Sequence, residues 1–129
     1  RSPLIRIPSS RGESTRIELR NPDPSANPYL VLAVCLAAGL DGIKNKITPP
    51  DEIRENVFEL DKQELEEHGV EALATDLHQA VKGLKKDKFI QEVLGVHIAE
   101  KYIEAKEAEW DSYRAQVTDW EVEEYLYKF

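Results

Sequence analysis

The chain has 129 residues, about one domain by length, and 41% hydrophobic and 33% charged residues, which is typical of a folded globular protein and excludes a disordered one. Its net charge of −8 is unevenly spread: residues 47–129 carry ten basic and 21 acidic groups (net −11), whereas residues 1–46 carry seven basic and four acidic groups (net +3). The acidic majority excludes nucleic acid as a general partner, because phosphate contacts need a basic surface.

No segment has the features of an export signal or a membrane span. No positively charged leader precedes a short apolar run, and the longest apolar stretch, residues 29–40, is well short of the roughly 20 residues that cross a bilayer. Cys35 is the only cysteine, so an internal disulfide is excluded and a small buried hydrophobe is expected. We therefore expect a cytoplasmic protein without a membrane partner. The absence of methionine indicates that Arg1 is not a natural start and that the chain is part of a longer protein.

Two short strands are predicted near the N-terminus. Residues 3–8 are bounded by prolines, and residues 15–19 alternate so that Arg16, Glu18 and Arg20 share one face. Two strands alone are marginally stable. We therefore expect both to belong to a larger antiparallel sheet whose other strands lie outside this chain.

About five helices are predicted after the strands, which makes the fold class α+β. Residues 27–47 should form a buried core helix, because Asn27 suits the cap, Pro28 suits the first helical position, and the residues through Leu40 are apolar on every side. Residues 48–60 begin with prolines after this helix and are expected to be irregular.

Residues 61–118 are predicted to form a helical region. Asp61 and Glu64 have the spacing of a capping box, in which each side chain accepts a hydrogen bond from the other residue's backbone. Thr75 and Asp87 are expected to cap the next two helices, since short polar side chains accept hydrogen bonds from the first free N–H groups.

A final helix is predicted over residues 119–129. Its apolar side chains follow i, i+3, i+4, i+7 spacing and are Val122, Tyr125, Leu126 and Phe129. A helix this short needs a surface to pack on. That surface is either the chain's own core or another subunit, and the pattern alone leaves both alternatives open.

The most distinctive polar pattern is Arg16-x-Glu18-x-Arg20. A carboxylate between two guanidiniums stays ionised and can bind a divalent cation, while arginines hold anions that share the metal. The alternative is an exposed strand with ordinary ion pairs, which contribute little to stability. Arg1 and Arg6 form a second pair with the same two interpretations.

Four longer motifs fill residues 1–46: Arg1-Ser-Pro-Leu-Ile-Arg6-Ile-Pro, Thr15-Arg16-Ile-Glu18-Leu-Arg20, Pro22-Asp-Pro-Ser-Ala-Asn-Pro-Tyr-Leu30 and Ala38-Gly-Leu-Asp-Gly-Ile43. Their order and spacing resemble glutamine synthetase type I, and residues 104–107, 109–111 and 121–125 look like that family's closing helices. The resemblance implies the C-terminal portion of the catalytic domain, with residues 1–24 as active-site strands and a turn.

The family joins glutamate to ammonia with ATP through a glutamyl phosphate intermediate, and the resemblance implies a role for each residue of the motifs. Glu18 matches a ligand of Mg²⁺ or Mn²⁺. Arg1 and Arg6 match arginines at the transferring phosphate and are the expected catalytic residues. Arg6 and Arg16 match ATP-binding residues, and Arg20 together with Arg1 matches the glutamate site.

The resemblance also implies an assembly. The family's active enzyme is a dodecamer of two hexameric rings, and residues 119–129 match the oligomerisation helix that docks into the opposite ring. Other metal ligands and part of each active site would lie outside this chain, so the isolated chain is expected to be inactive. Where an adenylylated subtype has Asn-Leu-Tyr, residues 56–58 read Asn-Val-Phe, which implies the non-adenylylated subtype.

Two other functions remain open from the sequence. One is a related ligase that joins glutamate to an amine other than ammonia, since Arg-x-Glu-x-Arg would be shared there. The other is a non-catalytic interaction module, in which the acidic helices bind a partner and the arginines are structural.

Overall fold

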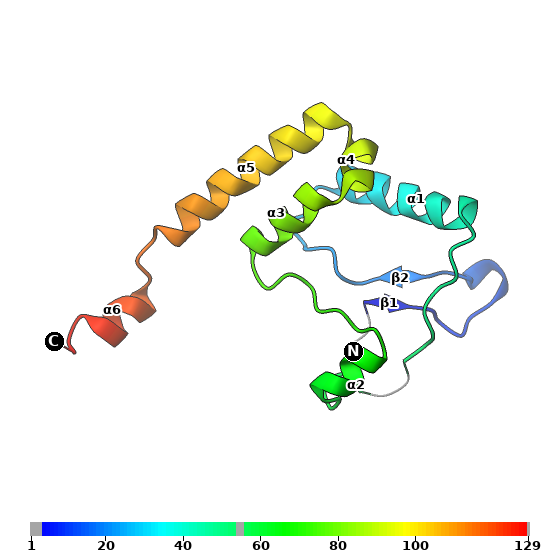
Figure 1. The fold of residues 1–129 in the computed structure, drawn as a ribbon, viewed down its shortest axis with the longest axis horizontal. Coiled ribbons are helices and arrows are strands. Elements are labelled where there is room, and N and C mark those ends of the chain that lie inside the picture. The colour runs from blue at the N-terminus through cyan, green and yellow to red at the C-terminus, as the bar shows by residue number, and fades with distance from the viewer. Residues whose placement is uncertain (1–3, 54–55, 129) are drawn as a thin grey trace. The chain divides into compact units, whose positions relative to one another are not determined.

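The computed structural model describes residues 4–53 and 56–128. These residues form two strands, a short 3-10 helix and six α-helices (Figure 1): β1 (Ile5–Arg6), η1 (Gly12–Ser14), β2 (Glu18–Leu19), α1 (Pro28–Lys44), α2 (Lys62–Glu67), α3 (Leu77–Lys86), α4 (Lys88–Leu94), α5 (Val96–Arg114) and α6 (Asp119–Tyr125). The predicted α+β class is confirmed. The chain divides into two compact units, residues 1–72 and residues 73–129.

The first unit begins with a two-stranded antiparallel ribbon. Ile5 pairs with Leu19 and Arg6 with Glu18, and the backbone N–H of Arg20 donates to the carbonyl of Leu4 at 2.8 Å. Both strands are shorter than the predicted stretches, because proline has no N–H to continue the pairing on the β1 side and the chain then turns through η1. The two strands pair with each other, which fixes which of their side chains are neighbours.

Helix α1 begins and ends close to its predicted limits. The side-chain oxygen of Asn27 accepts hydrogen bonds from the N–H groups of Tyr29 (3.0 Å) and Leu30 (3.4 Å), and Pro28 occupies the first helical position. This satisfies two of the N–H groups that every helix start leaves unpaired.

The burial predicted for α1 is not present within this chain alone. None of its residues is buried, Tyr29 is 82% exposed and Ile43 is 76% exposed. Cys35 is exposed as well, which corrects its expected burial. A helix that is apolar on every side needs cover on more than one side. Among the described residues, no other helix or strand of this unit packs on α1.

The remaining part of the first unit follows the sequence pattern. Residues 48–53 and 56–60 contain no helix or strand, and residues 54–55 of the predicted irregular segment lie outside the described residues. The capping box of α2 is present: the N–H of Glu64 donates to Asp61 at 2.9 Å, and the N–H of Asp61 donates to Glu64 at 2.8 Å. Gly69 ends this helix with a φ of +63°, which glycine adopts without strain.

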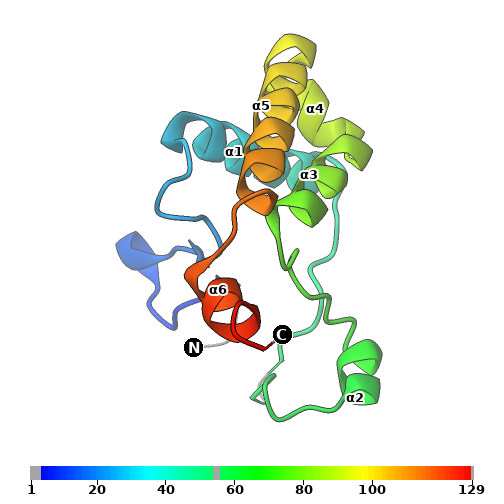
Figure 2. The same ribbon diagram turned by 90° about the vertical axis from the view of Figure 1, so that its left-hand side faces the viewer.

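The second unit is built around α3, α4 and α5, which pack on one another (Figure 2). Val81 of α3 and Ala99 of α5 form its core, with 5% and 1% of their surfaces exposed. The cap of α3 is Asp76 rather than the predicted Thr75, because the carboxylate of Asp76 accepts from the N–H of Gln79 at 2.8 Å. The predicted cap of α4, Asp87, is confirmed.

Helix α6 is shorter than the predicted 119–129. It starts from a capping box of Thr118 and Glu121 and ends at Tyr125, while Phe129 lies outside the described residues. Val122 and Leu126 are 40% and 61% exposed, and no other described helix or strand packs on α6. In the part of the chain that the structure describes, no helix combines the length and apolar character that crossing a bilayer requires.

The core of the second unit can be tested by overfilling it. Ala99→Leu places three extra carbons where 1% of the residue is exposed, and such overpacking costs about 1–3 kcal/mol. We expect a lower midpoint of urea unfolding for the 129-residue chain. Ala105→Leu, the same change at an exposed position of α5, is the control and should leave the midpoint nearly unchanged. Equal midpoints for both variants would contradict this packing.

Candidate functional site

The β1–β2 ribbon joins three of the predicted site residues through one carboxylate. Arg6 Nε donates to Glu18 Oε2 at 2.7 Å and Arg6 Nη2 donates to Oε1 at 2.9 Å, so this pair is bidentate. Arg16 Nη2 and Nε donate to the same Oε1 at 2.8 and 3.1 Å. The antiparallel register sets Arg6 directly across from Glu18, and the i, i+2 spacing brings Arg16 to the same face.

The opposite charges in this cluster stabilise the ionised form of Glu18 and of Arg6. The hydrogen bond from Arg6 is the largest cause that lowers the pKa of Glu18, followed by the hydrogen bond from Arg16. The same bond to Glu18 raises the pKa of Arg6. The carboxylate is therefore ionised throughout the neutral range, and the three groups together carry a net charge of +1. A half-exposed cluster of this kind attracts anions.

Of the two other predicted arginines, only Arg20 lies within the described residues, and it stands apart from the cluster. The side chain of Arg20 is exposed and makes no hydrogen bond or ion pair with any residue that the structure describes, although its backbone extends the ribbon. Arg1 lies outside the described residues. Arg16, Glu18 and Arg20 were predicted to share one face. Of these three residues, only Arg16 and Glu18 are in contact.

The cluster fits a partial metal site. Magnesium binds through one or two carboxylates and completes its shell with water and phosphate oxygens, so Glu18 suits the role of a single protein ligand. Within residues 4–53 and 56–128, no group of three or more histidine, cysteine or acidic side chains comes together to hold an ion. The described residues therefore supply no complete set of protein ligands for such an ion.

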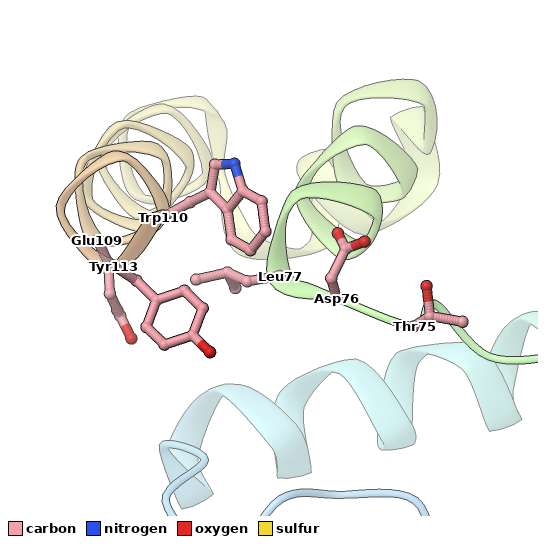
Figure 3. Close-up of a pocket in the computed structure, with 6 residues that line it drawn as sticks. All are labelled: Thr75, Asp76, Leu77, Glu109, Trp110 and Tyr113. Carbon is pink, nitrogen blue, oxygen red and sulfur yellow. The ribbon is translucent and has the colours of Figure 1, made fainter. Parts of the chain in front are cut away.

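A shallow pocket of about 370 Å³ lies in the second unit, between the start of α3 and the end of α5 (Figure 3). Its lining is Thr75, Asp76, Leu77, Glu109, Trp110 and Tyr113. Both of its carboxylates are already used locally: Asp76 accepts from Gln79, and Glu109 accepts from Lys106 at 2.5 Å. The ring of Trp110 stacks on His78 with centroids 5.8 Å apart. These groups support helix packing and do not form a catalytic set.

The sequence pattern missed the pairing of Arg6 with Glu18, because it grouped Arg6 with Arg1. The signal that could have found it is the register of the two strands. The 11 residues between Arg6 and Glu18 form a loop too long for turn chemistry to fix that register. Only the folded ribbon shows that Arg6 and Arg16 approach Glu18 together.

Comparisons with known proteins show which family this chain is similar to. The family model described as "Glutamine synthetase, catalytic domain" matches residues 1–125. A glutamine synthetase from Clostridium saccharobutylicum is 50% identical over all 129 residues, and one from Staphylococcus aureus (strain MW2) is 48% identical over the same span. A solved structure described as "Apo GmaS without ligand" matches with a TM-score of 0.69 and 38% identity, over 86% of this chain and 25% of that chain.

These matches define the class as an α+β catalytic domain, and the motifs found in the sequence lie inside the matched region. The chain belongs to the glutamine synthetase catalytic-domain family. All 129 residues of this chain are aligned with each of these two relatives. They span only 29% of the length of those relatives.

Removing one guanidinium should change the ionisation of the cluster. In Arg6→Gln the pKa of Glu18 should rise towards the ordinary glutamate value of about 4.3, because the largest cause of its lowering is gone. Arg16→Gln should raise it less. Arg11→Gln is the matched control, since Arg11 donates only to backbone carbonyls among the described residues. The measurement is a ¹³C NMR titration of the Glu18 carboxyl group in the 129-residue chain.

The sign of the pH effect follows from the lowered pKa. The cluster contributes to stability above the unfolded-state pKa of about 4.3 and loses that contribution as the pH falls through the lower folded-state pKa. If Arg6→Gln and Arg11→Gln give the same Glu18 titration as the unchanged chain, Arg6 and Glu18 are not paired in solution.

Proposed function

We propose that this chain is part of an ATP-dependent glutamate–ammonia ligase, which makes glutamine from glutamate, ammonia and ATP through a glutamyl phosphate intermediate. The observation that carries the proposal is the Arg6–Glu18–Arg16 cluster, in a chain of the glutamine synthetase catalytic-domain family. Phosphoryl transfer depends mainly on positioning and on fixed positive charge at the moving phosphate. A carboxylate with two guanidiniums supplies a cation ligand and anion-binding groups within one ribbon.

The proposal gives each of these residues at least one role. Arg6 and Arg1 stabilise the transferring phosphoryl group, and Arg6 and Arg16 bind the phosphates of ATP through their planar forks. Arg20, with Arg1, holds the substrate glutamate, which agrees with a side chain left exposed at the end of the ribbon. Glu18 would hold Mg²⁺ or Mn²⁺, and such an ion would supply positive charge that neutralises the phosphate oxygens.

The chain alone is proposed to be inactive. It spans 29% of the length of its curated relatives, and its described residues hold one candidate metal ligand and no cluster of three. The remaining ligands, the ammonia site and the strands that would extend the β1–β2 ribbon are proposed to come from the rest of the protein. A cytoplasmic location suits a chain with one cysteine and no internal disulfide.

The absence of adenylylation is part of the same proposal. Residues 56–58 lie at a turn, and Phe58 is 84% exposed, so the position is accessible. Phenylalanine has no hydroxyl group to accept a nucleotide. We therefore assign the chain to the non-adenylylated subtype.

The metal role of Glu18 can be tested in the full-length protein. Glu18→Gln removes the charge of the ligand while keeping its size, and the loss of one oriented electrostatic group typically lowers the rate about 10²–10³-fold. Glutamine formation from glutamate, ammonia and ATP is the measurement. Glu13→Gln, the same change in the exposed helix η1, should retain full activity. Full activity of Glu18→Gln at saturating metal would show that Glu18 forms ordinary surface ion pairs and is not a metal ligand.

We further propose that the full-length protein forms a dodecamer of two hexameric rings held together through α6. Its apolar side chains are exposed, and no described helix or strand covers them. Burying each Val or Leu of this kind contributes on the order of 1.5–3 kcal/mol, repeated over every symmetric copy.

Deleting residues 125–129 from the full-length protein should therefore split the double ring into single rings. Light scattering coupled to size-exclusion chromatography measures the mass. Lys128→Ala, which removes the ion pair with Glu124 and the cation–π contact with the Tyr125 ring but keeps the apolar side chains, should leave the double ring intact. A truncated protein that remains a dodecamer would show that α6 packs within its own subunit.

A further inference from the structure

The second unit carries a group of lysines where α3 meets α4. Residues 77–91 contain four lysines and one acidic residue, Asp87, whereas residues 92–129 contain ten acidic and four basic residues. The carboxylate of Asp87 is used locally, because it caps α4 and accepts from the N–H of Ile90 at 3.0 Å. The junction of these two helices is therefore a basic surface on an otherwise acidic unit.

Ion pairing separates three of these lysines from every other lysine and arginine of the unit. Lys82, Lys86 and Lys88 are exposed, and none of them forms an ion pair with a residue that the structure describes. The other five are each paired with an acid: Lys85 with Glu107, Lys101 with Glu104, Lys106 with Glu109, Arg114 with Asp111 and Lys128 with Glu124. Although acids are in excess, the unpaired cations of the unit thus gather within seven residues, which we call the lysine corner.

Helix stability does not account for the lysine corner. Lys82 and Lys86 are four residues apart on α3, so they share a face, and like charges at this spacing destabilise a helix. Lys86 lies in the last turn of α3, where the helix dipole favours a cation, but Lys82 lies before that turn. Lys88 is the first residue of α4, where the dipole disfavours a cation, and it forms no ion pair with Glu92 four residues on.

The carboxylates of a short acidic protein segment suit this surface. Each lysine ammonium is a compact charge on a flexible stem, so it can meet a carboxylate without the fixed geometry that a guanidinium fork requires. None of the three lysines lines the pocket between α3 and α5, so they present an exposed surface to a partner. A nucleic acid would extend beyond these three cations onto the acidic remainder of a chain with a net charge of −8.

We propose that the lysine corner is a docking surface for an acidic segment of another protein, whose carboxylates pair with Lys82, Lys86 and Lys88. Such a partner relieves the repulsion between Lys82 and Lys86. Because the contact consists of exposed ion pairs, it is weak and sensitive to salt. The proposal is independent of the ligase function, since these lysines lie outside the Arg6–Glu18–Arg16 cluster.

The test is binding of a fluorescein-labelled peptide of ten glutamates to the full-length protein at low ionic strength, followed by fluorescence anisotropy. Lys82→Gln, Lys86→Gln and Lys88→Gln together should weaken binding about tenfold, as expected from losing three exposed ion pairs. Replacing the same lysines by arginine keeps their charge and should retain binding. Salt at about 0.3 M should remove the difference between the variants.

The matched control removes the same charge from other exposed lysines. Lys46→Gln, Lys62→Gln and Lys101→Gln together should change the affinity for the peptide little. Equal weakening by both triple variants overturns the proposal in favour of a general charge effect. Loss of binding in the arginine variant also overturns it, because the charges are still present there.

Other occupants of the lysine corner give different results. If the unchanged full-length protein does not bind the peptide, the corner is not an accessible docking surface. If a single-stranded DNA of ten nucleotides binds more tightly and depends on the same three lysines, the partner is a nucleic acid and the proposal is wrong. If the triple glutamine variant of the corner changes the mass of the full-length protein in light scattering, the corner is a contact between copies of this chain, which overturns a separate partner.

Discussion

The pairing of Glu18 with two guanidiniums is the interaction on which this account depends. It exists because the antiparallel register of β1 and β2 sets Arg6 opposite Glu18 and because Arg16 lies two residues earlier on the same face. One acid and two fixed cations, held within hydrogen-bond distance, give a site that attracts phosphate and can offer a carboxylate oxygen to a metal. No other group of side chains in the described residues combines these properties.

Helix α1 and the β1–β2 ribbon expose apolar surface that the other described residues of their unit do not cover. Helix α1 has no buried residue, and Ile5, Ile17 and Leu19 of the ribbon region are exposed. Such surfaces are stable only when other apolar groups cover them, since exposed apolar area costs free energy in water. This agrees with a chain that spans 29% of the length of its curated relatives. By contrast, α3, α4 and α5 pack on one another and bury Val81 and Ala99 within the chain.

Helix caps and turn residues in the sequence predicted the helices and strands well. Features that depend on distant parts of the chain were not predicted. The caps at Asn27, Asp61 and Asp87 are confirmed, because a cap depends on hydrogen bonds within four residues. The cap of α3 moved by one residue, from Thr75 to Asp76, since both are good caps and only the backbone geometry chooses between them. The burial of α1 depends on what surrounds it, which its own sequence does not encode.

The candidate site shows the same division. The spacing of Arg16 and Glu18 predicted their contact, because alternation along a strand is a local property. The part of Arg6 in the cluster required the strand register, which an intervening loop of 11 residues leaves open in the sequence. Family resemblance supplied the roles of the residues, and the folded ribbon supplied their contacts.

The most direct test of the central claim is the position of the metal itself. Crystals of the full-length protein with Mn²⁺ and a non-hydrolysable ATP analogue would locate the ion by anomalous scattering. The account predicts an anomalous peak about 2.1 Å from a Glu18 carboxylate oxygen, with Arg6 and Arg16 turned to the phosphates. A Mn²⁺ ion bound elsewhere, with both arginines still hydrogen-bonded to Glu18, would contradict it.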